Sequence, residues 1–550
     1  MDTSCSGAAA HKTVSHKTVA SCFWANVCEQ ANEPAFADAG SGRTDTQINA
    51  DDTADNNLPC NAPDWLTWGQ LGVLAAKWVA AVQQLSLQPG QHVASCLPNA
   101  LDWILLDIAL QSLGLVHVAI DPRETLVQRQ YLIEYSQARY VLDSSTNLLR
   151  ESLRTEFLGT EFLSTPHATI AASRRLAERV DESAAAQMLF TSGSAGTPKG
   201  VLLSHRNLLT NAQAKLSAAP QQPSDLRLNL LPFAHAYART CELSTWILSR
   251  SRLAIATSWA DMQRQARLLR PTLINVVPFL AERLAEVLER DPQALGGQLR
   301  LLQVGGAALP TDLWERLRRI GLPPLQGYGL TEAAPVVCSN QAGQQRPASV
   351  GPPVNGVDVR LDNSGVLWCR GPNVMLGYWR NPAATEASLD NGWLCTGDLA
   401  EFTADGHVRI LGRASQQIVL STGYNVSPEL IERELCGLAG IERALVFGHG
   451  QPHVVALLWR SSAQPASERS REETDCLKSW QVRIAEQLSR FPRHAIPSRF
   501  AWIESPLTLE SGLLTVKGSP RRAQIADCYR AILAELYGKS PSGYSRMLQG

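Results

Sequence analysis

The stretch that decides the fold of this chain reads Thr191-Ser192-Gly193-Ser194-Ala195-Gly196-Thr197-Pro198-Lys199-Gly200. It lies between two short apolar runs, 188–190 and 201–203, which predicts a loop between two strands. Glycines let a backbone come close to an oxyanion, while hydroxyl groups and a lysine add hydrogen bonds and positive charge. We therefore expect phosphate contacts from Thr191, Ser192, Gly193, Ser194, Gly196, Thr197 and Lys199.

This loop does not follow the Walker pattern. That pattern requires Gly-Lys followed by Ser or Thr, whereas this chain has Pro198-Lys199-Gly200. Kinase-like and GTPase functions lose support for this reason. The simplest alternative is a flexible surface loop rich in serine and glycine, which many chains of this length contain.

On both sides of the loop, strand and helix patterns alternate. Apolar residues over 71–82 have the spacing of one buried helix face, and 93–97, 101–113 and 116–120 predict a strand, a helix and a strand. Strand, helix, strand predicts a parallel sheet and an α/β fold.

A second glycine turn follows the predicted strand 301–304. Gly305-Gly306 come directly after that strand, and a helix pattern over 310–320 follows. Ligands bind open α/β sheets at the carboxyl ends of their strands, where helix N-termini offer free N–H groups. We expect a nucleotide site along that edge.

At 550 residues the chain is too long for one core, so we expect two domains. We predict a large domain of layered sheets and helices over 31–411. After it the pattern changes to a hairpin-like pair, 444–447 with 453–459, and a polar helix over 474–490, which predicts a smaller, mobile α+β domain over 412–550. Residues 1–30 carry the polar repeat His-Lys-Thr-Val and are predicted to be a disordered start.

The composition narrows the class of protein. A formal net charge of -1 gives no overall attraction to nucleic acid. The 12 cysteines form no Cys-x-x-Cys pair, which is typical of reduced thiols in a cytoplasmic protein. No apolar run approaches the roughly 20 residues of a membrane span, and no signal peptide pattern is visible, so we predict a cytoplasmic protein without a transmembrane segment.

Four further segments give the chain a family resemblance. They are Gln326-Gly327-Tyr328-Gly329-Leu330-Thr331-Glu332, Thr396-Gly397-Asp398-Leu399, Gly412-Arg413 and Gly423-Tyr424-Asn425-Val426. With the loop at 191–200, in this order and spacing, the set resembles the adenylate-forming superfamily of acyl-CoA synthetases, nonribosomal-peptide adenylation domains and luciferases. The resemblance covers 67–522 and implies activation of a carboxylic acid by ATP as an acyl-AMP.

The resemblance implies a role for each matching residue. Tyr328 stacks on adenine beside the backbone of Gly305, Gly306, Ala307 and Gly329, and Asp398 and Arg413 hold the ribose hydroxyls. Glu332 is the implied Mg²⁺ ligand and Thr331 a donor to the α-phosphate. His235 meets the carboxylate or closes the acyl tunnel, and Gly423 lines the tunnel for a thiol. Taken singly, each of these residues has an ordinary alternative as a core residue, an ion pair or a helix cap.

The chain departs from the family pattern at two positions. The catalytic lysine of the family lies in a C-terminal segment whose counterpart here is 511–522, and an ungapped alignment places Ser519 at that position. We hypothesise that Lys517, two residues earlier, takes this catalytic role, with Lys199 supplying part of the charge. At the hinge, Ser415 stands where the family has Asp or Lys.

The substrate reading rests on segments that resemble the long-chain acyl-CoA synthetase branch, namely 418–423, 239–243 and 511–515. They favour a medium or long fatty acid and coenzyme A as the thiol acceptor. Two alternatives stay open. The acyl group could pass to the pantetheine of an acyl or peptidyl carrier protein, or the protein could be a homologue impaired in adenylation, a reading motivated by Ser519 and Ser415.

Overall fold

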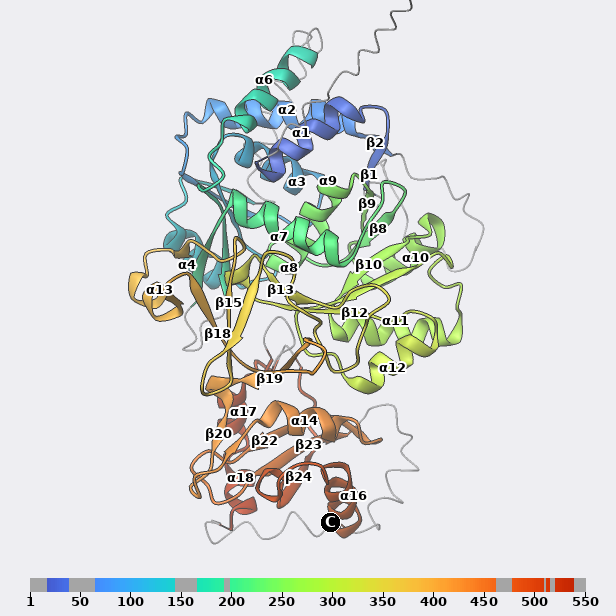
Figure 1. Ribbon diagram of the computed structural model, residues 1–550, viewed down its shortest axis with the longest axis vertical. Helices are drawn as coiled ribbons and strands as arrows, with labels where there is room; N and C mark the ends of the chain where they lie inside the picture. Colours follow the sequence, from blue (N-terminus) through green and yellow to red (C-terminus); the bar gives the residue numbers. More distant parts are fainter. Residues whose placement is uncertain are drawn as a thin grey trace, which may run out of the picture.

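The computed structural model describes residues 17–38, 65–143, 166–191, 198–460, 477–508, 511–514 and 520–538. A large unit of sheets and helices fills the upper part of Figure 1, and a smaller unit around its own sheet lies below it. The predicted fold class, an α/β large domain followed by a smaller α+β unit, is confirmed.

The first sheet of the large unit has eight strands in the order β13-β12-β11-β10-β8-β9-β1-β2. Its middle strands, from β9 to β12, run parallel. Their bounds are β1 Pro34–Asp38, β2 Leu66–Thr67, β8 Leu226–Asn229, β9 Arg252–Ile255, β10 Leu273–Val276, β11 Leu301–Val304, β12 Leu325–Gly329 and β13 Val336–Ser339. The strand predicted over 301–304 is β11, and the glycine turn follows it as expected.

The second sheet has six strands in the order β16-β7-β6-β4-β3-β5. They are β3 His92–Cys96, β4 Val116–Ala119, β5 Tyr140–Asp143, β6 Ala185–Thr191, β7 Lys199–Ser204 and β16 Gly377–Tyr378. Strands β6 and β7 pair antiparallel and end at the pair Thr191 and Lys199. The predicted phosphate loop therefore connects two strands of this sheet.

A third, antiparallel sheet carries the later motifs. It contains β14 Asp358–Leu361, β15 Val366–Arg370, β17 Leu389–Asp390, β18 Trp393–Phe402 and β19 Val408–Arg413. Strand β19 pairs with β18 along its length. The boundary that we predicted between 411 and 412 falls inside β19, so the division at that residue stays a prediction.

Helices cover both faces of the first sheet. Those of the large unit are α1 Val19–Glu29, α2 Trp68–Gln84, α3 Leu101–Ser112, α4 Leu126–Ser136, α6 Pro166–Glu178, α7 His205–Ala218, α8 Ala236–Ala238, α9 Thr245–Ser249, α10 Trp259–Leu269, α11 Pro278–Arg290, α12 Thr311–Arg319 and α13 Pro382–Ser388. Helices α10, α11 and α12 lie together on one side (Figure 1) and pack on the sheet through a separate apolar cluster. Helices α7 and α9 belong to the main core, which joins the first and second sheets.

The smaller unit packs helices on both faces of one sheet. The sheet has β22 Ile441–Phe447, β23 Val455–Arg460 and β24 Arg499–Ile503, and β22 and β23 form the predicted antiparallel pair. Helices α14 Pro428–Cys436 and α16 Leu477–Gln487 share one apolar cluster with it, and α17 Arg522–Cys528 and α18 Arg530–Leu536 share the other. A two-stranded hairpin, β20 Ile418–Val419 and β21 Asn425–Val426, precedes them.

The prediction of a disordered start over residues 1–30 is wrong for its second half. Thr18, in the second copy of the polar repeat, caps helix α1 and accepts a hydrogen bond from the backbone N–H of Ser21. Phe23 and Trp24 on that helix are fully buried. The repeat was misleading because its last threonine and valine are a helix cap and the first helical residue, a role that polar composition does not reveal.

Among the residues that the structure describes, we find no helix with the length and apolar character needed to cross a membrane.

Candidate active site

A tyrosine, a carboxylate and an arginine meet where β12 faces the β18–β19 ladder. The phenol O–H of Tyr328 donates to Oδ2 of Asp398. Nε of Arg413 lies 2.8 Å from Oδ1 of the same carboxylate, and the ladder pairs the two residues directly. Three of the residues that we predicted to bind the nucleotide therefore form one connected group, here called the ribose cluster.

In the ribose cluster the carboxylate of Asp398 is buried, whereas the guanidinium of Arg413 reaches solvent. Burial raises the pKa of the Asp398 carboxyl, and the charge of Arg413 opposes that rise. The side chain of Asp398 is 6% exposed and that of Arg413 is 47% exposed. Each carboxylate oxygen has two lone pairs, so Asp398 keeps acceptor capacity for a ligand hydroxyl.

Glu332 stands at the centre of a second group, here called the phosphate cluster. It lies on the short 3₁₀ helix η2, Thr331–Ala333, whose first residue Thr331 is half-buried. The phenol O–H of Tyr378 donates to Oε1 of Glu332 at 2.8 Å. Nζ of Lys199 lies 4.7 Å from the centroid of the Tyr378 ring. Lys199 and Glu332 thus both contact Tyr378, at the end of the predicted phosphate loop.

His235 lies beside a buried aspartate that follows β4. Its Nε2 is 3.0 Å from Oδ2 of Asp121, and Nη2 of Arg123 is 2.6 Å from the same oxygen. Burial alone would raise the pKa of Asp121, but the contacts with His235 and Arg123 hold it well below its usual range. The histidine therefore lies within ion-pair distance of a carboxylate, while its buried Nε2 has no hydrogen-bond partner of good geometry among the described residues.

The glycine turns bring backbone close to other groups. A Cβ on Gly305 would lie 2.9 Å from Cζ of Tyr237, and one on Gly329 would lie 1.9 Å from the carbonyl oxygen of Pro335. A cavity of about 50 Å³ opens beside these residues, and Gly305, Gly306, Tyr328 and Gly329 line it. Ala307 is exposed and is not among its lining residues.

An unusual helix contributes to the wall of this cavity. Residues Arg239–Ser244 form a π-helix, η1, between α8 and α9. Within η1, Arg239 lies 2.8 Å from Asp107, Glu242 lies 3.5 Å from Arg227, and Cys241 lines the cavity. Single π-helical turns occur frequently at functional sites.

Several predicted site residues are not joined to these groups. Six of them lie outside the described residues, namely Ser192, Gly193, Ser194, Gly196, Thr197 and Lys517. Gly423 is exposed in the turn between β20 and β21, with no described atom within 4 Å of a Cβ placed on it. Their roles stay predictions.

Helix α14 of the smaller unit packs against the end of β19, at the residue before Arg413. A Cβ on Gly412 would lie 2.9 Å from Oε2 of Glu429. On the same helix, Glu432 lies 2.8 Å from Nη2 of Arg522, which also donates from Nη1 to the carbonyl oxygen of Val446 at 2.7 Å. The C-terminal arginine of the predicted catalytic segment is thus anchored within the smaller unit.

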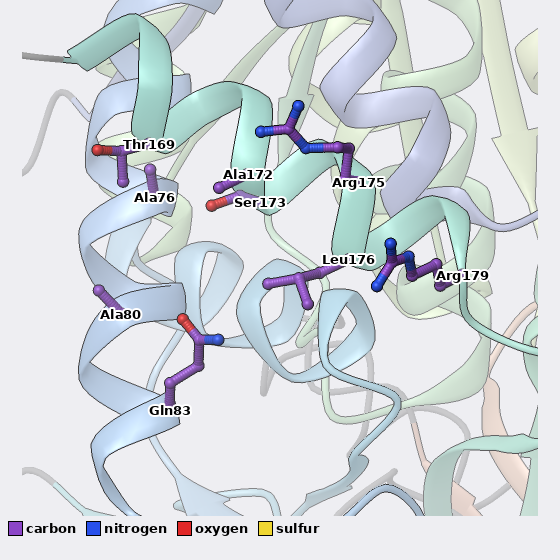
Figure 2. Close-up of a pocket in the computed structure, with 9 residues that line it drawn as sticks. All are labelled: Ala76, Ala80, Gln83, Thr169, Ala172, Ser173, Arg175, Leu176 and Arg179. Atoms are coloured by element: carbon purple, nitrogen blue, oxygen red, sulfur yellow. The ribbon is translucent and has the colours of Figure 1, made fainter.

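A larger hollow lies away from all of these residues. Figure 2 shows it between α2 and α6, with a volume of about 320 Å³. Its lining residues are Ala76, Ala80, Gln83, Thr169, Ala172, Ser173, Arg175, Leu176 and Arg179. None of them belongs to the motifs, so size alone does not identify the active site.

The connected motif residues agree with what known families show. A family profile described as AMP-binding enzyme matches residues 46–379, and one described as AMP-binding enzyme C-terminal domain matches residues 415–541. The chain belongs to the AMP-binding enzyme family. The predicted superfamily is confirmed.

Relatives of this AMP-binding enzyme include ligases with different substrates. Long-chain-fatty-acid--CoA ligase FadD15 of Mycobacterium bovis is 27% identical over 445 residues, 68% of this chain and 74% of the relative. Feruloyl-CoA synthase of an Amycolatopsis species is 28% identical over 486 residues, 83% of this chain and 94% of the relative. The family and these relatives confirm the predicted enzyme class, an AMP-forming acid–thiol ligase.

The fold of the AMP-binding enzyme also matches solved structures. ATP-bound MatB from Rhodopseudomonas palustris superposes with a TM-score of 0.72 and 22% identity, over 93% of this chain and 99% of that chain. This likeness supports the fold alone.

Sequence reasoning missed three contact residues in the AMP-binding enzyme. Tyr378 connects Lys199 and Glu332, but only the pairing of β16 with β7 brings it there. Asp121 and Arg123 follow the predicted strand 116–120 at its carboxyl end. The rule that pointed to Gly305 could have found Asp121, because both residues follow a parallel strand at the edge where ligands bind.

Proposed function

We propose that this enzyme activates a carboxylic acid with ATP and then transfers the acyl group to coenzyme A. A carboxylate oxygen attacks the α-phosphorus of ATP, the bond to pyrophosphate breaks, and acyl-AMP forms. The thiol sulfur of coenzyme A then attacks the acyl carbon, and AMP leaves. The ribose cluster carries this proposal, because it joins three separate motifs of the family into one acceptor and donor group.

The chain's own residues would act mainly by positioning. The ring of Tyr328 offers a flat face to adenine, and Asp398 and Arg413 offer an acceptor and donors to ribose hydroxyls. Lys199 and Thr331 would contact phosphate oxygens, and His235, which lies beside Asp121, would meet the incoming carboxylate. Such fixed donors stabilise the charge of an in-line displacement without covalent chemistry.

Glu332 is suited to a Mg²⁺ ion that arrives with ATP. Tyr378 donates to Oε1 of Glu332, and among the described residues none donates a hydrogen bond to Oε2. Mg²⁺ is commonly held by one or two carboxylates together with phosphates and water. When bound, it would neutralise phosphate charge.

The smaller unit would serve as a mobile lid over this site. We place the boundary between the two units between residues 411 and 412, with helix α1 in the larger unit, and assign Lys517 the role of charge donor to the reacting phosphate. A hinge at β19 is supported by the packing of α14 against the end of that strand, where Glu429 lies close to Gly412. Arg522 is anchored to the same helix through Glu432. Gly423 would line the path of the thiol. A cytoplasmic location is supported by the free thiols of all nine cysteines that the structure describes.

Coenzyme A is the proposed acceptor because both reported relatives are named for it. Their acids differ, one being a long-chain fatty acid and the other feruloyl, so the relatives leave the acid open. The resemblance to the long-chain branch favours a medium or long fatty acid. The carrier-protein alternative is tested by exchanging the thiol.

The deciding experiment follows pyrophosphate release with ATP and Mg²⁺ across acids of increasing chain length, first without a thiol and then with coenzyme A. We expect pyrophosphate release with at least one acid, followed by AMP release and loss of free thiol. If carrier-bound pantetheine is consumed and coenzyme A is not, the proposed acceptor is wrong. Binding of ATP by calorimetry without pyrophosphate release from any acid would support the adenylation-impaired alternative instead.

A further inference from the structure

The cavity between the ribose cluster and η1 contains a buried cation. Among the eleven described residues that line it, Lys215 carries the one charged side chain. Lys215 lies in the last turn of α7 and is 3% exposed. The other walls include Val304, Val336 and Tyr237, so most of the lining is apolar or backbone.

The ammonium group of Lys215 is short of partners. Its Nζ donates to Oγ of Ser339 at 2.9 Å, which uses one of three N–H donors. No carboxylate of the described residues forms an ion pair with it. Burial lowers the pKa of Lys215, and its neighbour Cys241 stays a neutral thiol because burial raises the pKa of that group to about 12.

A buried ammonium without a counter-ion is unfavourable unless a ligand supplies the negative charge. Other buried cations of this protein have such a partner: Arg239 lies 2.8 Å from Asp107, and Arg227 lies 3.5 Å from Glu242. Both of these pairs lie in or against η1, the same wall that faces the cavity. Lys215 therefore differs from its buried neighbours in facing a hollow instead of a carboxylate.

The cavity is also small. About 50 Å³ holds roughly three to five water-sized groups. The Tyr237 ring packs directly against the backbone of Gly305, which limits the space on that side. A short chain fits this volume, whereas a long fatty chain requires the walls to move apart.

We propose that the acyl pocket of this enzyme takes a short acid with a second carboxylate at its far end, and that Lys215 binds this distal carboxylate. The proposal rests on the function proposed above: one carboxylate is activated at the ribose and phosphate clusters, and the other reaches Lys215. It names Lys215 as a specificity-determining residue and predicts a short dicarboxylic acid where sequence resemblance favours a fatty acid.

The test compares matched pairs of acids in the full-length enzyme by pyrophosphate release. Succinate, glutarate and adipate are each paired with the monocarboxylate of equal carbon number, and palmitate represents long fatty acids. We expect kcat/KM for the best diacid to exceed that of its partner at least 10-fold. In Lys215→Met the diacid should lose 10-fold to 100-fold, mainly through KM, while its monocarboxylate partner changes less than 3-fold.

Arg206→Met is the matched control, because Arg206 is an exposed cation on the same helix. It should leave the ratio of diacid to monoacid unchanged. A lysine with a purely structural role would lower the thermal unfolding temperature in Lys215→Met and leave that ratio unchanged, which would overturn the proposal. If Lys215→Met does not fold, the wild-type ratio decides alone, and a preference for monocarboxylates or palmitate overturns the proposal.

The outcomes separate this proposal from the proposed function. Pyrophosphate release with monocarboxylates or palmitate only would leave acid activation intact and reject the role of Lys215. Absence of release with every acid would reject both.

Discussion

The ribose cluster and the C-terminal segment 511–522 differ in how the chain holds them. In the ribose cluster, Tyr328, Asp398 and Arg413 contact one another, and two of them are direct partners in the β18–β19 ladder. In the C-terminal segment the described contacts lie at the flanks, where Leu514 pairs with Pro520 and Arg521 donates its N–H to the carbonyl oxygen of Leu513. The proposed catalytic Lys517 lies in the sequence between those flanks.

This difference indicates which positions of a motif can differ from the family pattern while the protein keeps the same chemistry. A residue fixed by a ladder cannot move to a neighbouring position, because a shift by one residue turns its side chain to the other face. A residue outside a ladder is in general under no such restriction. In the sequence the ribose cluster matches the family pattern residue by residue, whereas the lysine that we propose, Lys517, lies two positions before the family's lysine position, which Ser519 occupies.

The largest effect is expected for Asp398→Ala, which removes the proposed acceptor of the ribose hydroxyls. Hydrogen bonds to charged groups contribute about 1.5–3 kcal/mol each, so losing two such bonds to ribose predicts a decrease of roughly 10³-fold in kcat/KM for ATP. ATP–pyrophosphate exchange measures it. Glu401→Ala is the control, since Glu401 pairs with Arg409 on the same ladder but is half exposed; equal losses in both variants would reject the role of Asp398.

For Lys517→Ala we expect a decrease of about 10²-fold in the rate of acyl-AMP formation, typical of removing one donor to a developing negative charge. Transfer of the acyl group from supplied acyl-AMP to coenzyme A should change little. Ser519→Lys in the Lys517→Ala background should restore part of the rate, because it returns lysine to the family position. An unchanged rate of adenylation in Lys517→Ala would mean that Lys517 is not the catalytic lysine.

A smaller effect is expected within the phosphate cluster. Tyr378→Phe removes the hydrogen bond to Glu332 and keeps the ring beneath Lys199. One hydrogen bond to a carboxylate predicts an increase of about 10-fold in the Mg²⁺ concentration needed for half-maximal exchange. Tyr131→Phe, on an exposed tyrosine of α4, serves as the control. The same Mg²⁺ dependence in Tyr378→Phe as in the wild type would argue against Glu332 as the metal ligand.

The smallest effect concerns stability and its dependence on pH. His235 and Arg123 lower the pKa of Asp121 in the folded protein, so Asp121 stabilises the fold at pH values above the ordinary carboxyl pKa of about 4. That contribution is lost as the pH falls from there toward the folded pKa. Asp121→Asn should cost about 1 kcal/mol in the free energy of unfolding at pH 6, measured with urea. The difference in the free energy of unfolding between the variant and the wild type should decrease below about pH 4. A difference that does not depend on pH would contradict the ion-pair explanation.

Local patterns were sufficient for much of this fold. The apolar run 301–304 followed by two glycines became β11 and its turn, and the pair 444–447 and 453–459 became β22 and β23. Each of these elements is bounded by residues whose backbone preferences agree with the fold. Helix α1 was missed because a polar repeat conceals a helix cap.

From the sequence, only those site residues that belong to a recognisable motif could be predicted. Tyr328, Asp398, Glu332 and Arg413 were named from the sequence because each belongs to a motif. Tyr378 and Lys215 were not, since their meaning depends on contacts between distant segments: β16 beside β7, and α7 beside β13. A cation opposite an apolar cavity is recognisable only once tertiary packing has formed the cavity.

The π-helix η1 constrains the length of the chain as well as its residues. Its wide turn allows Arg239, Cys241 and Glu242 to serve three separate neighbours within six residues. Deleting one residue would restore α-helical geometry, because the hydrogen bonds of a π-helix span one residue more than those of an α-helix. Either a buried ion pair or the cavity wall would then lose its side chain. An alignment gap at this position in a related chain would accordingly mark a change in the cavity that η1 lines and not a neutral variation in loop length.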